Sequence, residues 1–130
     1  MRMPFSARLW VAMAALLGCT ALAGPVHAAR DAAGAEVLFR QGREALERQD
    51  YVTACAKFAE SQQLDPAAGT LMNWATCEEQ RGRVASAWQH WQEAIDYLPA
   101  GDERIEFARS RMAELEPKLP GKLPIGMLAR

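Results

Sequence analysis

The chain has 130 residues, of which 50% are hydrophobic and 24% are charged. After a predicted leader that ends at Ala28, 16 acidic residues stand against 13 Lys and Arg, so there is no basic surplus to bind nucleic acid. The remaining length of roughly 100 residues suits one small domain. Ala, Glu, Arg, Gln and Leu dominate this part, and no segment alternates as a strand does, which predicts an all-α protein.

Residues 1–28 have the features of a secretory signal peptide. Arg2 and Arg8 make the start basic, and an uncharged apolar run covers 9–23. That run is shorter than the roughly 20 apolar residues of a membrane span. Residues 26–28, Val-His-Ala, match the small-x-small pattern of a cleavage site. The pattern predicts export to the periplasm or cell envelope of a bacterium.

Two products of export are consistent with this leader. Cleavage after Ala28 would release a soluble protein that begins at Ala29. Alternatively, residues 16–19, Leu-Leu-Gly-Cys, resemble a lipobox, in which Cys19 would carry a lipid and become the first mature residue. We expect contact with a membrane only in the second case.

Five stretches of the mature part carry apolar residues at helical spacing. They predict helices over 31–48 (or from 35), 52–64, 71–80, 84–98 and 103–116. Asp50, Thr70 and Asp102 precede three of these helices as predicted N-caps. Gly82 follows the third helix, where a glycine commonly ends a helix.

The pattern over 35–99 predicts a helical hairpin that occurs twice in tandem. Residues 35–66 align with 68–99 at a shift of 33 residues. The shift pairs Gly42 with Ala75, Ala54 with Ala87, Ser61 with Ala94, Leu38 with Leu71, Phe58 with Trp91, and Pro66 with Pro99. Small residues let two helices cross closely, and proline ends the second helix of each copy.

This pattern resembles the tetratricopeptide (TPR) repeat, a helix–turn–helix of about 34 residues. The matching residues are Gly42, Tyr51, Ala54, Phe58, Leu64, Asp65 and Pro66, then Ala75, Gly82, Ala87, Trp91, Ala94 and Pro99. Gln41 and Glu78 depart from it, since the family usually has large apolar residues there. The resemblance implies two antiparallel hairpins in a short right-handed α-solenoid within a domain over 29–116. The helix at 102–116 is expected to cap the last repeat.

The resemblance also implies a scaffold for protein–protein interaction, not an enzyme. In TPR proteins the first helix of each hairpin lines a concave groove for an extended peptide. Here the lining would be Phe39, Arg43, Leu46, Glu47, Met72, Thr76, Glu79, Ile105 and Arg109. Arg43 and Arg109 are expected to hold a carboxylate through bidentate hydrogen bonds. One alternative is that two repeats form only a shallow surface of solvated side chains. Another is a lipid-anchored structural subunit of an envelope complex without a groove ligand.

Cys55 and Cys77 remain after the leader is removed, and an oxidising compartment predicts a disulfide between them. In the repeat architecture their helices stack against each other. The alternatives are buried free thiols or, as a separate function, a cysteine-based metal or redox protein.

Other polar residues give no sign of catalysis or of a bound cofactor. His90 does not stand at a zinc-site spacing from the cysteines and is expected to be a solvated surface residue. Glu78 and Glu79 are expected on a helix surface. The sequence contains no phosphate loop and no nucleophile motif, so no enzyme activity, metal or cofactor is predicted.

Two further predictions concern the tryptophan residues and the C-terminal tail. Trp74 and Trp91 are predicted core residues, whereas Trp88 either packs on the fifth helix or stays exposed. The tail over 117–130 is rich in Pro and Gly and is expected to be flexible, or else to dock on a partner through its apolar residues.

Overall fold

The computed structural model describes residues 30–121, and every regular element in that range is helical. The elements are α1 (Ala32–Glu47), α2 (Tyr51–Leu64), α3 (Ala68–Gln80), α4 (Val84–Asp96), α5 (Glu103–Leu115) and a 3₁₀ turn, η1 (Glu116–Lys118). This confirms the all-α prediction. The predicted leader, Cys19 and the tail from 122 to 130 lie outside the described residues.

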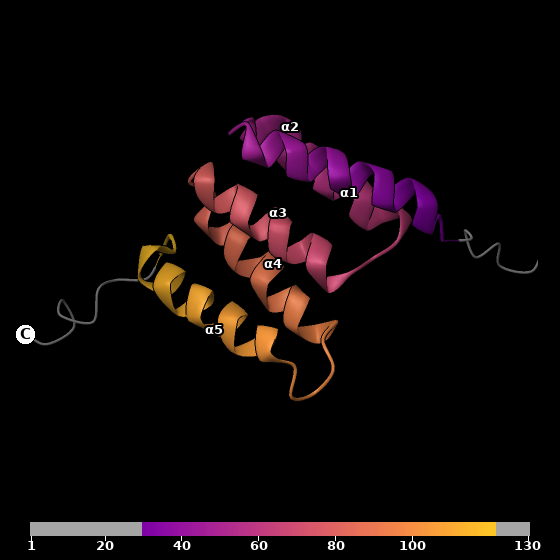
Figure 1. The fold of residues 1–130 in the computed structure, drawn as a ribbon. Helices are drawn as coiled ribbons and strands as arrows, with labels where there is room; N and C mark the ends of the chain where they lie inside the picture. Colours follow the sequence, from indigo (N-terminus) through magenta and orange to yellow (C-terminus); the bar gives the residue numbers. More distant parts are fainter. Residues whose placement is uncertain (1–29, 122–130) are drawn as a thin grey trace, which may run out of the picture.

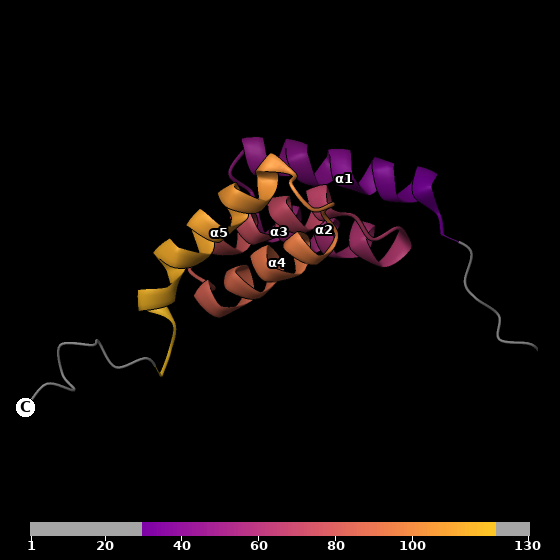
Figure 2. The same cartoon turned by 90° about the horizontal axis from the view of Figure 1, so that it is seen from below.

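The helices pack in adjacent pairs that follow one another in chain order. Helix α1 packs on α2, α3 on α4 and α5 on α4, while α2 also contacts α3. The α1–α2 pair therefore lies at one end of the molecule and α5 at the other (Figure 1). Seen from below, α5 lies beside α4, and α1 and α5 run at an angle to each other (Figure 2). The Asp31 N–H donates to the Leu64 carbonyl at 3.2 Å, so α1 and α2 run antiparallel.

Close packing of α1 on α2 depends on a glycine. A Cβ atom at Gly42 would lie 2.7 Å from the ring of Phe58, which is fully buried. Phe39 packs against the same ring, with centroids 5.8 Å apart. The first core cluster consists of Ala45, Ala54, Cys55, Phe58 and Cys77. Small residues at the crossing thus make room for one large aromatic ring, as the sequence predicted.

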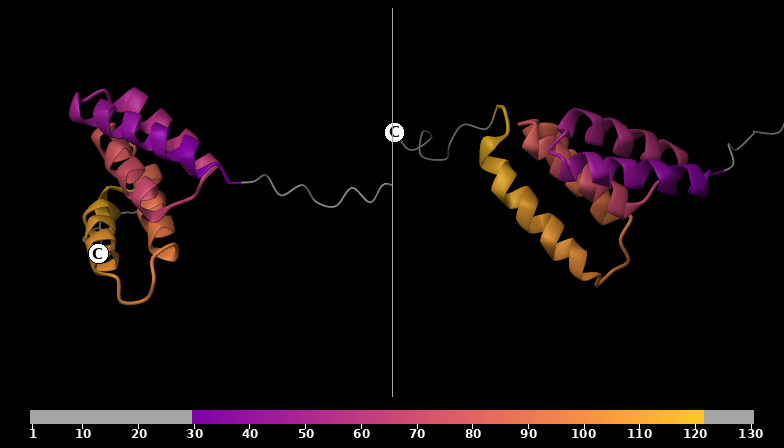
Figure 3. Two further views of the ribbon diagram at one scale, coloured as in Figure 1. Left: turned by 45° about the vertical axis from the view of Figure 1, so that its right-hand side comes forward. Right: turned by 45° about the horizontal axis from the view of Figure 1, so that its top comes forward.

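A second core cluster joins α3, α4 and α5. It consists of Ala75, Ala87, Trp91, Ala108 and Leu115. Trp91 is 1% exposed, which confirms its predicted core position. Trp88 packs partly buried against this cluster, and Trp74 packs partly buried against the first cluster. Figure 3 shows α5 at the end of the molecule remote from α1, in a position that covers part of the second pair.

Most of the predicted helix starts are confirmed by their caps. The Asp50 carboxylate accepts a hydrogen bond from the Thr53 N–H at 3.1 Å, and the Asp102 carboxylate accepts one from the Arg104 N–H at 3.0 Å. The Arg104 side chain also bonds to Asp102, and these hydrogen bonds lower the pKa of that carboxyl to about 2. Gly82, with φ +71°, ends α3 as predicted.

The predicted cap at Thr70 is wrong. Helix α3 begins earlier, at Ala68, and Ala67 occupies the cap position without a side-chain hydrogen bond. The proline at 66 explains the early start, because it holds Asp65 in an extended conformation and the chain turns directly into the helix. Thr70 instead lies within the first turn and is buried.

Three helices end earlier than predicted, and α1 does so by one residue, at Glu47. Helix α4 ends at Asp96, after which the N–H groups of Tyr97 and Leu98 bond to carbonyls three residues back. Helix α5 ends at Leu115 and continues as η1. The segment expected to be flexible from residue 117 therefore begins with a 3₁₀ turn, in which Pro117 stands at a position that needs no N–H donor.

Candidate functional site

The two cysteines join the first helix pair to the second. The Sγ atoms of Cys55 on α2 and Cys77 on α3 lie 2.09 Å apart, and their Cα atoms 5.6 Å apart. The structure thus pairs them as a disulfide, as predicted. Both residues are buried, at 3% and 0% exposure. The bond belongs to the core and fixes α3 against α2.

The residues predicted to line a groove come from α1, α3 and α5. Arg43, Glu47 and Arg109 are exposed, and Phe39, Leu46, Met72, Thr76 and Ile105 are partly buried. Some of their polar groups already have partners. The Thr76 hydroxyl donates to the Met72 carbonyl at 2.9 Å, and Arg109 pairs with Glu106 on the same helix at 2.7 Å.

Glu79, also predicted to line the groove, is occupied by contacts within the protein. Its carboxylate accepts a hydrogen bond from Trp91 Nε1 at 2.6 Å and pairs with the Arg111 guanidinium. The hydrogen bond to Glu79 raises the pKa of Arg111. The Glu79 side chain is only 10% exposed. Glu79 therefore ties α5 to α3 and is not free to contact a ligand.

Glu78 is buried, which corrects the prediction of a Glu78–Glu79 surface pair. It is 4% exposed, and its Oε1 accepts a hydrogen bond from Trp74 Nε1 at 3.4 Å. Arg81 and Arg83 each approach its carboxylate to 3.6 Å. The two arginines follow at the end of the same helix and the turn, where they compensate the buried negative charge.

His90 is also not the solvated residue that was predicted. Its ring stacks on Trp74, and its side chain is 14% exposed. Burial lowers the pKa of the imidazole. Nδ1 has no hydrogen-bond partner within residues 30–121. The helical spacing could have predicted this burial. His90 is three residues after Ala87 and four before Ala94, and both alanines are buried.

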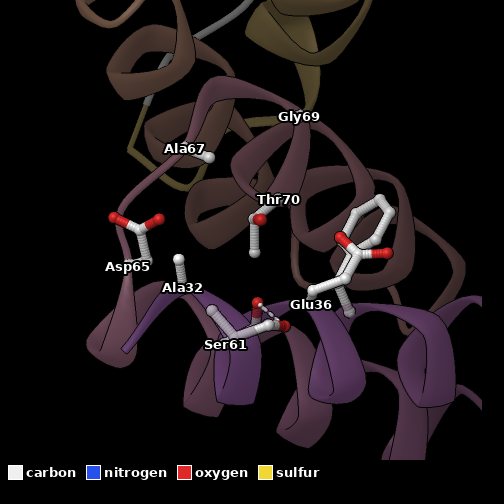
Figure 4. A pocket seen from close by; sticks show the side chains of 9 residues that line it. Ala32, Glu36, Ser61, Asp65, Ala67, Gly69 and Thr70 are labelled. Carbon is white, nitrogen blue, oxygen red and sulfur yellow. Dashed lines mark hydrogen bonds between the residues drawn. The ribbon is translucent and has the colours of Figure 1, made fainter. Parts of the chain in front are cut away.

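A cavity of about 210 Å³ opens between α1, the end of α2 and the start of α3 (Figure 4). Its lining is Ala32, Ala35, Glu36, Phe39, Ser61, Asp65, Ala67, Gly69 and Thr70. Of the predicted groove residues, only Phe39 contributes. This site was not predicted from the sequence because residues of three separate elements form it. The prediction of Thr70 as a cap also placed the start of α3 beyond Gly69.

The polar side chains of this cavity differ in how closely they contact other groups of the protein. The Ser61 hydroxyl donates to the Ala35 carbonyl at 2.8 Å and links α2 to α1. The carboxyl groups of Glu36 and Asp65 stand on opposite sides of the space (Figure 4). Arginine side chains approach them only to 3.9 Å and 4.0 Å, from Arg40 and Arg30 respectively. The start of α3 supplies backbone N–H donors between them.

Among residues 30–121, no three His, Cys, Asp or Glu side chains are grouped closely enough to hold a metal ion. None of the helices in that range has the length and apolar character needed to cross a membrane. No family model matches the sequence, and no curated protein or solved structure matches it either.

Proposed function

We propose that this protein is an exported TPR-like scaffold, in which two helical hairpins and a capping helix form a short solenoid. Its function would be to bind an extended segment of another protein across α1, α3 and α5. Export is inferred from the leader over 1–28 and places the interaction in a bacterial periplasm or cell envelope. A lipid at Cys19 would attach the same scaffold to a membrane.

The repeat interpretation is supported by equivalent packing in the two helix pairs. In the first pair, the Phe58 ring fills the space beside Gly42. In the second pair, Trp91 lies in one cluster with Ala75 and Ala87. These residues are related by the 33-residue shift of the sequence. A sequence repeat that keeps both its small and its large packing positions favours a repeated structural unit.

The observation that carries the binding proposal is a row of partly exposed apolar residues on alternate helices. Phe39, Met72 and Ile105 are separated by 33 residues each and come from α1, α3 and α5. Packed helices lie about 8–10 Å apart, and an extended peptide rises about 3.3 Å per residue. Such a row would therefore contact about every third side chain of a peptide laid across the helices.

A second row gives the charge expected of the partner. One helical turn after the apolar row, Arg43 and Arg109 are exposed on α1 and α5. Arg109 is paired with Glu106, whereas Arg43 has no ion-pair partner within residues 30–121. Glu79 cannot offset Arg43 at the surface, because Arg111 and Trp91 occupy its carboxylate. The preferred peptide would thus combine apolar residues at three-residue spacing with flanking Asp or Glu.

An array of random peptides tests this proposal with the mature, oxidised protein as the probe. We expect enrichment of acidic peptides with apolar residues every third position, and loss of their binding in Arg43→Glu. The control is Arg48→Glu, which makes the same charge change on an exposed residue at the end of α1. Equal binding by both variants would exclude this face.

A second candidate function, a subunit of a larger assembly, is favoured by Phe107 on α5. Its side chain is 54% exposed, although its ring meets Trp91 edge-on at 5.6 Å. Phe107 is 33 residues after Trp74, which α4 covers through His90. A helix from another subunit would cover Phe107 in the same manner. Loss of a native complex from envelope extracts in Phe107→Ser would support this function.

A further inference from the structure

We propose that the cavity between α1 and α3 binds an α-ammonium group together with the carbonyl or carboxylate next to it. This chemistry occurs at the amino end of a peptide and in a free amino acid. In its peptide form the inference rests on the proposed function, for which it names the end of the peptide that is held. The cavity volume of about 210 Å³ suits a small ligand group.

The start of α3 supplies hydrogen-bond donors that the protein does not use. The first backbone N–H of this region with a backbone acceptor is that of Leu71, which bonds to the Ala67 carbonyl at 3.2 Å. The N–H groups of Ala68, Gly69 and Thr70 have no acceptor within residues 30–121. Such donors, together with the helix dipole, favour a carbonyl or carboxylate oxygen.

The hydroxyl of Thr70 is an independent indication of a ligand. Thr70 is only 5% exposed, and its side chain lines the cavity and extends into it (Figure 4). No residue within 30–121 shares a hydrogen bond with this hydroxyl, and its oxygen is not closed off from solvent. Water in the cavity can therefore bond to it, and a bound ammonium or carbonyl group would take the place of that water.

Carboxylates at the sides of the cavity offer acceptors for a positive group. Glu36 and Asp65 place two carboxylates at its sides (Figure 4). Their partners Arg40 and Arg30 are 66% and 77% exposed, and at 3.9–4.0 Å such surface pairs are weak. Each carboxylate keeps an arginine nearby, so the ionic charges around the cavity nearly balance, and the helix start adds roughly half a positive charge. The two carboxylates can still accept hydrogen bonds from a positive group, which favours a ligand that carries one close to its oxygen acceptor.

An α-ammonium group beside a carbonyl meets both requirements. The ammonium would donate hydrogen bonds to the carboxylates at the sides of the cavity and to the Thr70 hydroxyl. The carbonyl or carboxylate oxygen would accept hydrogen bonds from the free backbone N–H groups at the start of α3. A lysine or arginine side chain has the charge but no acceptor, so it would leave the α3 amides unused. Ala32, Ala35 and Phe39 supply an apolar wall, which favours a small apolar first side chain.

The test uses ¹⁵N-labelled mature protein with its disulfide intact and three probes. The probes are L-alanyl-L-alanine, free L-alanine and N-acetyl-alanyl-alanine. We expect saturable shifts of the Gly69 and Thr70 amide signals with an unblocked probe, and at least tenfold weaker binding of the acetylated one. Tenfold tighter binding of the dipeptide than of alanine would identify a peptide end, whereas equal affinity would identify an amino-acid site.

Two variants that preserve the fold make the assignment specific. Thr70→Val replaces the hydroxyl by a methyl group. Gly69→Val narrows the cavity and fits without a clash at its Cβ atom, which would meet nothing within 4 Å. Each should weaken dipeptide binding at least tenfold. Thr76→Val is the control, since that hydroxyl bonds within α3 and does not line the cavity. Unchanged affinity in Thr70→Val and Glu36→Gln would overturn the proposal, as would no saturable shift with either unblocked probe.

The experiments distinguish a failure of the cavity proposal from a failure of the proposed peptide-binding groove. Glu36 and Arg43 are seven residues apart on α1, which is about 10 Å along a helix. A dipeptide of about 7 Å does not span that distance. Dipeptide binding should therefore be unaffected by Arg43→Glu, which tests the groove alone.

Discussion

The imidazole of His90 on α4 stacks on the indole of Trp74 on α3, with ring centroids 3.9 Å apart and planes inclined by 25°. Trp74 also donates its Nε1–H to the buried Glu78. One aromatic side chain thus connects a titratable residue and a buried carboxylate across the second helix pair. Because His90 is largely enclosed, its protonation should affect the stability of the whole pair.

We predict that stability falls as the pH is lowered from 7.5 to 5. Burial, partly opposed by Glu93 and Glu78, lowers the pKa of His90 below its usual value of about 6.5. The unfolded chain therefore binds a proton more readily than the folded one. The contribution is fully present above the unfolded pKa and is lost as pH falls through the folded pKa. In His90→Gln, the melting temperature should depend less on pH than in the wild type; identical slopes would contradict this.

Gly42→Ala should destabilise the first pair although alanine favours helix. The added Cβ would lie 2.7 Å from the buried Phe58 ring. Overpacking of this kind costs about 1–3 kcal/mol, against a propensity gain of about 1 kcal/mol. Thermal unfolding of Gly69→Ala is the matched control, because open space surrounds that position and its melting temperature should not fall. A rise for Gly42→Ala would refute the close crossing.

Glu79→Ala should loosen α5. The substitution removes the acceptor of Trp91 Nε1 and the partner of Arg111. Leaving a buried donor without a partner costs about 1–3 kcal/mol. Hydrogen exchange over 103–115 should become faster, whereas Arg109→Ala, which removes only an exposed pair, should leave exchange close to that of the wild type. Equal exchange in both variants would mean that Glu79 does not hold the helix.

Reduction of the Cys55–Cys77 bond should lower the free energy of unfolding by about 3 kcal/mol, since the bond closes a loop with a sequence separation of 22. For a domain of this size, each kcal/mol shifts the melting temperature by about 4–8 °C. Calorimetry with and without reductant measures the difference. The Cys55→Ala/Cys77→Ala variant should have the same melting temperature as the reduced protein, and reductant should not change it.

The parts of the fold that follow from local periodicity were predictable. The five helices, the Asp50 and Asp102 caps and the burial of Trp91 each depend on residues close in sequence or on the 33-residue repeat. The cysteine pair followed from the expected stacking of two successive helices.

The polar interior was not predictable, because its partners are distant in the sequence. Glu79 and Arg111 are 32 residues apart, and nothing local distinguishes them from solvated surface residues. The cavity was missed for the same reason, since Glu36 and Thr70 meet only after α1 packs near α3. The Thr70 prediction failed because the proline at 66 started the helix three residues earlier.

The measurement that tests the central claim most directly is amide chemical-shift mapping of the protein with a peptide selected on the array. We expect shifts along α1, α3 and α5, centred near Phe39, Met72 and Ile105, and their loss in Arg43→Glu but not in Arg48→Glu. Shifts confined to α2 and α4, or equal shifts in both variants, would contradict a peptide-binding face on α1, α3 and α5.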